Sequence, residues 1–147
     1  MNYIKRDIES TILDASRSYA ALIVTGPRQI GKTTTLLALA PDRAYVTLDD
    51  LEARRLASAD PEMFLSLYPA PLLIDEVQYA PQLFSQIKIA VDKGAAPGSY
   101  WMTGSQQFQL MELAQESLAG RAAILRMSGL SQHEIYGSGT SAPFSLS

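Results

Sequence analysis

The sequence contains no cysteine, and this absence excludes several kinds of site at once. Disulfide bonds, iron–sulfur clusters and thiolate zinc centres all require that residue. Histidine is also scarce, because His133 is the only one in the chain. Without other metal-ligating partners, His133 is expected to be structural or exposed rather than catalytic.

The chain also lacks a long apolar run and an excess of positive charge. No stretch approaches the ~20 apolar residues of a membrane-spanning helix, and the first residues form no apolar signal core. Lys and Arg number 12 against 15 Asp and Glu, for a formal net charge of −3. This composition indicates no basic surface for nucleic acid. We therefore expect a cytoplasmic domain without membrane association, for which direct nucleic-acid binding is unlikely on charge.

Short apolar segments alternate with segments of helical periodicity along most of the chain. The predicted strands are 20–25, 44–48, 72–75, 99–103 and 122–127. Helices are predicted over 4–19, 32–40, 83–93 and 108–118. Two more are predicted between the second and third strands, one capped by Asp49 or Asp50 and one running from Asp60-Pro61 through Leu67. Because the strands are apolar throughout, the pattern predicts an α/β fold with a parallel sheet covered on both faces.

Composition divides the chain into one domain and a tail. With 147 residues, the chain has the usual length of a single domain. We assign residues 1–136 to it, with 1–19 as a helix leading into the first strand. Residues 137–147 are rich in glycine and serine, which predicts a flexible tail or a truncated linker.

The segment Gly26–Thr33 matches the phosphate-binding pattern G-x-x-x-x-G-K-[ST] at every fixed position. A predicted strand leads in and a predicted helix leads out, which is the context that the motif requires. Successive backbone N–H groups and a helix N-terminus there suit an anion. Lys32 would reach the terminal phosphates of a nucleotide, and the Thr33 hydroxyl would ligate magnesium. The predicted nucleotide contacts are Gly26, Pro27, Arg28, Gln29, Ile30, Gly31, Lys32, Thr33 and Thr34.

Two carboxylates follow the third predicted strand. Ligands bind at the carboxyl ends of strands in such sheets, so Asp75 and Glu76 should lie near the phosphate-binding segment. Asp75 would hold magnesium, and Glu76 would act as general base on the attacking water. Gln78 lies close by in sequence, and a surface role is the simpler interpretation of it.

Three later residues are further candidates for catalysis. Ser105, or Thr103 as second choice, follows or ends the fourth predicted strand and would hydrogen-bond the water or the terminal phosphate. A serine there would also suit a helix N-cap. Arg121 precedes the last strand and would neutralise transition-state charge, in its own chain or in a neighbouring subunit. A surface arginine is the alternative.

Taken in order, the segments GPRQIGKTT, YVTLDD, LLIDEVQ, WMTGSQQF and ESLAGRAAILRMSGLSQHE resemble the N-terminal domain of a prokaryotic AAA+ ATPase family. In that family a C-terminal domain of unknown function usually follows. The resemblance implies a P-loop NTPase three-layer αβα sandwich, with five parallel strands in the order 5-1-4-3-2. It implies ATP and ADP as ligands with magnesium, and catalytic roles for Lys32, Glu76 and Ser105. It also makes Arg121 a candidate arginine finger.

The leading functional hypothesis is therefore an ATPase whose cycle drives a conformational change in an attached domain, a homo-oligomer or a partner. One alternative is a nucleotide-gated binding switch with little hydrolysis, in which ATP and ADP order or release loops. Another is the ATPase module of a DNA-directed motor or nuclease accessory, whose nucleic-acid contacts would lie outside this acidic domain.

Overall fold

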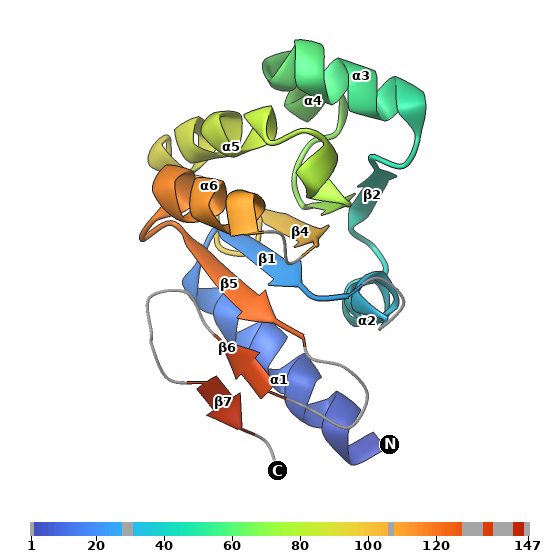
Figure 1. Ribbon diagram of the computed structural model, residues 1–147, viewed down its shortest axis with the longest axis vertical. Coiled ribbons are helices and arrows are strands. Elements are labelled where there is room, and N and C mark those ends of the chain that lie inside the picture. Colours follow the sequence, from blue (N-terminus) through green and yellow to red (C-terminus); the bar gives the residue numbers. More distant parts are fainter. Residues whose placement is uncertain (1, 28–30, 106–107, 128–133, 137–142, 146–147) are drawn as a thin grey trace.

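Five short apolar strands form one parallel sheet (Figure 1). The computed structural model describes residues 2–27, 31–105, 108–127, 134–136 and 143–145. The strands are β1 (Ala21–Thr25), β2 (Ala44–Thr47), β3 (Leu72–Asp75), β4 (Tyr100–Gly104) and β5 (Ala122–Arg126). Their order is β2-β3-β4-β1-β5, and every neighbouring pair is parallel. This is the predicted order 5-1-4-3-2 viewed from the other edge, so that prediction is confirmed.

The helices connect these strands, and several begin at residues that the sequence favours for that position. They are α1 (Asn2–Ser18), α2 (Lys32–Leu39), α3 (Leu51–Ala59), α4 (Pro61–Leu67), α5 (Gln82–Asp92) and α6 (Phe108–Leu118), with a short 3₁₀ helix, η1 (Val77–Tyr79). Asp50 and Asp60 cap α3 and α4, because each side chain accepts a hydrogen bond from a backbone N–H of the first turn. Among the described residues, no helix combines the length and the apolar character needed to cross a membrane.

Alternate residues of the strands fill two cores, one on each face of the sheet. Leu22 and Val24 of β1 belong to the core formed with α1 and α2. Ala21 and Ile23 of the same strand belong to the larger core, which α3, α4, α5 and α6 cover. Figure 1 shows these helix groups on opposite sides of the sheet. The fold is therefore a three-layer αβα sandwich, as predicted.

The strand register brings the carboxyl ends of the strands to one edge. Thr25 of β1 pairs with Gly104 of β4 and with Arg126 of β5. Thr47 of β2 pairs with Asp75 of β3. The segments that follow β1, β2, β3 and β4 therefore emerge at the same edge of the sheet, which we call the carboxyl edge.

Two short strands follow the parallel sheet. β6 (Glu134–Tyr136) pairs antiparallel with β7 (Pro143–Ser145). The flexible tail or truncated linker expected over 137–147 stays a prediction. Residues 137–142 and 146–147 lie outside the described part of the chain.

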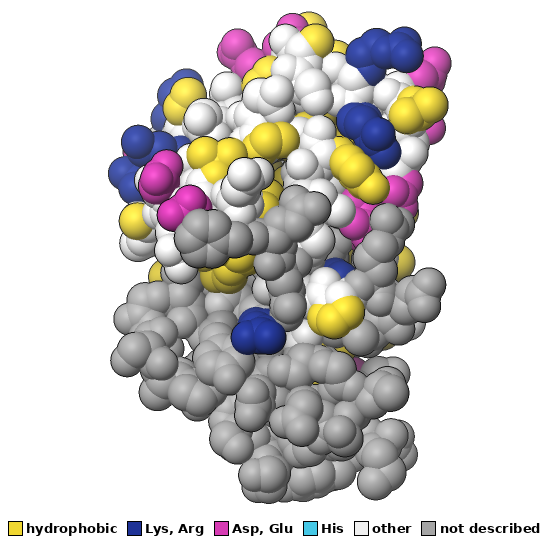
Figure 2. Space-filling model, in the orientation of Figure 1, with side chains coloured by type: hydrophobic (Ala, Val, Ile, Leu, Met, Phe, Trp, Pro, Cys, Tyr) yellow, Lys and Arg dark blue, Asp and Glu magenta, His cyan; other side chains and the backbone are white. Residues whose placement is uncertain are grey.

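Basic and acidic side chains are interspersed over the described surface on the face shown in Figure 2. Opposite charges mixed in this way produce little net field over a large area. This face therefore offers no extended patch of one charge among the residues that the structure describes.

Candidate functional site

The phosphate-binding segment begins where β1 ends and closes at the first turn of α2. Gly31 is the residue before α2 and has φ 88° and ψ 22°, a left-handed conformation that favours glycine. A Cβ at Gly31 would meet no atom within 4 Å, so the backbone angle and not crowding requires glycine there. Thr34 lies in the first turn of α2 with its side chain exposed. The predicted contacts Arg28, Gln29 and Ile30 lie outside the described residues.

Lys32 is buried with its ammonium group directed back onto the segment that precedes it. Its Nζ donates hydrogen bonds to the carbonyl oxygens of Gly26 at 2.7 Å and Pro27 at 2.9 Å. The side chain is only 5% exposed. The positive charge therefore lies beside Gly26 and Pro27, at the start of the phosphate-binding segment, where it would attract an anion.

Thr33 and Asp75 meet across 42 residues of sequence. The Thr33 hydroxyl donates to Asp75 Oδ1 at 2.5 Å. The same oxygen accepts a hydrogen bond from Thr103 Oγ1 at 2.6 Å, and Asp75 Oδ2 accepts one from the Tyr45 hydroxyl at 3.3 Å. The Asp75 carboxylate is thus oriented by hydroxyl groups from α2, β4 and β2.

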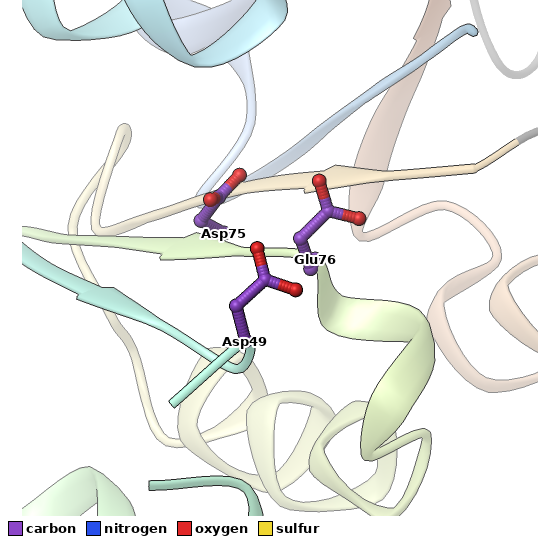
Figure 3. A group of neighbouring side chains, drawn as sticks. All are labelled: Asp49, Asp75 and Glu76. Atoms are coloured by element: carbon purple, nitrogen blue, oxygen red, sulfur yellow. The ribbon is translucent and has the colours of Figure 1, made fainter. Parts of the chain in front are cut away.

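Two more carboxylates lie beside Asp75. Oxygens of Asp49, Asp75 and Glu76 lie within 4.8 Å of one another. Figure 3 shows Asp75 and Glu76 at the end of β3 and Asp49 after β2, with all three carboxylates directed to the same side. Hydroxyl and carboxylate oxygens are the donors that Mg²⁺ prefers, so the residues present fit this ion.

Glu76 has an uncommon backbone conformation. Its φ is 61° and its ψ 52°, the left-handed region that few non-glycine residues enter. Its N–H donates to Thr103 Oγ1 at 3.0 Å, and its Oε1 accepts a hydrogen bond from Gln78 Nε2 at 2.6 Å. This conformation ends β3 and places the buried Glu76 side chain next to Asp75.

Ser105 and Thr103 differ in how their hydroxyls are used. Thr103 Oγ1 both donates to Asp75 and accepts from the Glu76 N–H. Ser105 Oγ is buried and has no hydrogen-bond partner among the described residues. An unsatisfied buried hydroxyl is costly, so a ligand that accepts its hydrogen bond would be favoured there.

Arg121 lies away from this group of residues. The next residue, Ala122, pairs with Ala21 at the start of β1, at the edge of the sheet opposite the phosphate-binding segment. Arg121 Nε instead donates to Asp92 Oδ1 at 2.7 Å, and this hydrogen bond lowers the pKa of Asp92. The structure therefore does not bring Arg121 together with the other candidate residues of its own chain. Its catalytic role, in its own chain or in a neighbouring subunit, stays a prediction.

Asp49 and Tyr45 join the site although the sequence analysis did not select them. The sequence left open whether Asp49 or Asp50 caps α3, and the structure assigns the cap to Asp50. Asp49 then lies with the carboxylates of β3. The signal was two adjacent acids at a strand end, of which only one can serve as the cap. His133 lies outside the described residues.

Comparisons with known proteins agree with this architecture. The family model described as an AAA domain matches residues 18–136. Two uncharacterised proteins, from Mycobacterium bovis and Mycobacterium tuberculosis, are each 34% identical to the chain over 134 residues. The matched region covers 89% of this chain but only 30% of either relative.

Proposed function

The chain belongs to the AAA domain family of ATPase-type nucleotide-binding modules, and we propose that it binds ATP with Mg²⁺ and hydrolyses it. One observation carries the proposal. Thr33 of the phosphate-binding segment and Asp75 of β3 are in direct contact at 2.5 Å, with Lys32 buried beside the loop and Glu76 directly after Asp75. This combination provides groups for the phosphates, the metal and the attacking water at one edge of the sheet.

In the proposed reaction, the ATP phosphates bind at the phosphate-binding segment and the N-terminus of α2. Lys32 exchanges its bonds to the Gly26 and Pro27 carbonyls for bonds to phosphate oxygens. Thr33 and Asp75 hold the Mg²⁺ ion, whose charge offsets that of the terminal phosphates. These residues position the substrate and reduce the electrostatic cost of phosphoryl transfer.

Glu76 acts as general base on water. As the water oxygen bonds to the γ-phosphorus, Glu76 accepts a proton from that water. The bond between the γ-phosphorus and the bridging oxygen breaks, and ADP and phosphate are released. The Ser105 hydroxyl, which has no partner among the described residues, donates a hydrogen bond to the terminal phosphate.

The nucleotide cycle is proposed to move attached sequence or a partner. The chain spans 30% of the length of the mycobacterial relatives, so those proteins are long enough to contain such a segment. A neighbouring copy is another candidate, since Arg121 lies at the other edge of the sheet. Turnover that rises with protein concentration and falls in Arg121→Ala would support action between copies.

The direct test compares Glu76→Gln and Lys32→Ala with the parent protein by calorimetry and phosphate release. Glu76→Gln should bind Mg²⁺-ATP within about 2-fold of the parent, because the uncharged amide keeps the shape of the site. Its turnover should fall by about 10²-fold or more, since it lacks the base. Lys32→Ala should lose Mg²⁺-dependent binding.

The possible outcomes distinguish the proposed ATPase from the alternative functional hypotheses. Parental turnover in Glu76→Gln would show that Glu76 is not the base. Mg²⁺-dependent binding with negligible turnover in the parent would instead favour the nucleotide-gated switch. Absence of binding to the parent would contradict the assignment of the phosphate-binding segment.

A further inference from the structure

The Gln78 side chain connects Glu76 with the segment that follows β4. It lies in η1, two residues after Glu76. Its Nε2 donates to Glu76 Oε1 at 2.6 Å, and its Oε1 accepts a hydrogen bond from the backbone N–H of Ser105 at 3.3 Å. One amide side chain therefore contacts both the proposed base and the segment that follows β4.

The two contacts determine how the amide is oriented. With the amide reversed, its oxygen would face the Glu76 carboxylate and its NH₂ group would face the Ser105 N–H, so both contacts would be repulsive. Both hydrogen bonds therefore require glutamine or an equivalent donor and acceptor pair. A methionine of similar size provides neither group, and a glutamate provides only the acceptor.

Gly104 lies beside the Gln78 amide. A Cβ added to Gly104 would lie 3.1 Å from Leu110 Cδ2 and 3.5 Å from Gln78 Oε1. The first distance is crowded and the second is ordinary van der Waals contact, so the backbone at Gly104 runs directly past the amide. The carbonyl oxygen of Gly104 also accepts a hydrogen bond from the Gly26 N–H at 3.3 Å.

We propose that Gln78 is a positioning residue that holds the Glu76 carboxylate and links it to the phosphate-binding segment through Ser105 and Gly104. This inference depends on the proposed role of Glu76 as general base. The Gln78 contact occupies Oε1 of Glu76 and leaves Oε2 for the attacking water. A change at Gly26 on nucleotide binding reaches Glu76 through three hydrogen bonds, one peptide unit and the Gln78 amide.

The test measures turnover and Mg²⁺-ATP affinity of Gln78→Met and Gln78→Glu. Both variants should lower kcat by about 10- to 100-fold, because a misplaced catalytic group is costly even at small displacements. The dissociation constant for Mg²⁺-ATP should stay within about 2-fold of the parent value. The Gln78 amide hydrogen-bonds only to Glu76 and to the backbone N–H of Ser105 among the described residues, and neither group is a predicted contact of the phosphate-binding segment. Gln82→Met is the matched control, since Gln82 is exposed at the start of α5 and should leave both quantities unchanged.

A double-mutant cycle distinguishes positioning from a general structural effect. In a Glu76→Gln background, Gln78→Met should produce no further loss of turnover, because the group that it positions has been removed. Unchanged kcat in Gln78→Met, with turnover lost in Glu76→Gln, would overturn the role of Gln78 alone. Parental turnover in Glu76→Gln would instead overturn the proposed base.

A second readout does not depend on turnover. The side-chain amide signals of Gln78 in a ¹H–¹⁵N NMR spectrum should shift when Glu76 is changed to Gln, because a charge-assisted hydrogen bond is lost. The signals of Gln82 should not shift. Gln78 signals that stay in place in Glu76→Gln would overturn the proposal even if the chain hydrolysed no ATP.

Discussion

At the scale of single residues, Asp75 shows how hydroxyl groups orient a carboxylate of the site. Its two carboxylate oxygens accept hydrogen bonds from three hydroxyls, those of Thr33, Thr103 and Tyr45. Hydroxyl hydrogens rotate freely, so these groups can turn away from Asp75 without moving their oxygens. The carboxylate is therefore already oriented for a cation, and the predicted ligand Thr33 is already beside it.

Thr103 should be the most sensitive of these hydroxyls to removal. It is fully buried, and Thr103→Val would leave the N–H of Glu76 without its acceptor. A buried unsatisfied donor costs about 1–3 kcal/mol, so we expect the free energy of unfolding in urea to fall by about that amount. Thr25→Val is the control, because the Thr25 hydroxyl donates only a long 3.4 Å bond to the Leu125 carbonyl. Equal losses in the two variants would contradict the bridging role of Thr103.

The Tyr45 hydroxyl should titrate at a higher pH than an ordinary tyrosine. Burial raises its pKa, and the adjacent negative charge and hydrogen bond of Asp75 raise it further. Because the folded-state pKa lies above the unfolded value, the associated stability is present below about pH 10 and is lost as pH rises. Asp75→Asn should lower the Tyr45 pKa but leave it above the ordinary value, as measured by NMR of labelled tyrosine. Tyr100, whose pKa is raised by burial, should not respond.

At the scale of secondary-structure elements, side-chain contacts stabilise the edge of the sheet opposite the site. Trp101 Nε1 donates to Ser16 Oγ at 2.9 Å, which fastens α1 to β4. The Arg43 guanidinium lies 3.9 Å from the centre of the Trp101 ring and donates to the carbonyl oxygens of Leu72 and Ser99. Burial lowers the pKa of Arg43 to about 10. These contacts join α1, β3 and β4 at the amino ends of the strands, away from the carboxylates.

Gly98→Ala should loosen α1 without touching the site. A Cβ at Gly98 would lie 2.6 Å from Ser16 Oγ, and the residue has φ +78°. Gly94→Ala is a matched control, because its φ is +102° and a Cβ there meets nothing within 4 Å. Both variants should lose about 1–2 kcal/mol of stability from the left-handed backbone. Only Gly98→Ala should shift the fluorescence of Trp101, the single tryptophan, to longer wavelength.

An unchanged emission spectrum in Gly98→Ala would show that α1 accommodates the added methyl group without disturbing Trp101. A red shift in both variants would show that backbone strain, and not contact with Ser16, loosens the helix. The comparison therefore tests the docking of α1 separately from the conformational preference of glycine.

At the scale of the whole molecule, the sequence predicted the sheet well and the details of the site less well. Apolar strands and helical periodicity depend on local residue patterns, and they placed Lys32, Thr33, Asp75 and Glu76 near one edge. Arg121 lies away from these residues, and this position was available from the pattern. It precedes a parallel strand, so it must lie at the edge opposite the residues that follow the strands.

Other features depend on contacts between segments distant in sequence. The Gln78 amide is oriented by Ser105, 27 residues away, and no local pattern indicates that contact. Asp49 joins the carboxylate group because Asp50 occupies the cap of α3. Which of two adjacent acids caps a helix depends on the turn geometry, which composition does not determine.

The last prediction concerns the stability of the entire domain when nucleotide is bound. The site uses β1, α2, β3 and β4, so unfolding the sheet would disassemble it, and a ligand that binds only the folded state must stabilise the whole. Mg²⁺-ATP at 100 times its dissociation constant should add about 2.7 kcal/mol, which is about 10 °C in Tm for a domain of this size. Calorimetric scans should show this increase in the parent and in Arg121→Ala, whose side chain lies at the opposite edge. The increase should vanish in Lys32→Ala and shrink when EDTA removes the metal. An increase of equal size in Lys32→Ala would place the nucleotide elsewhere on the domain.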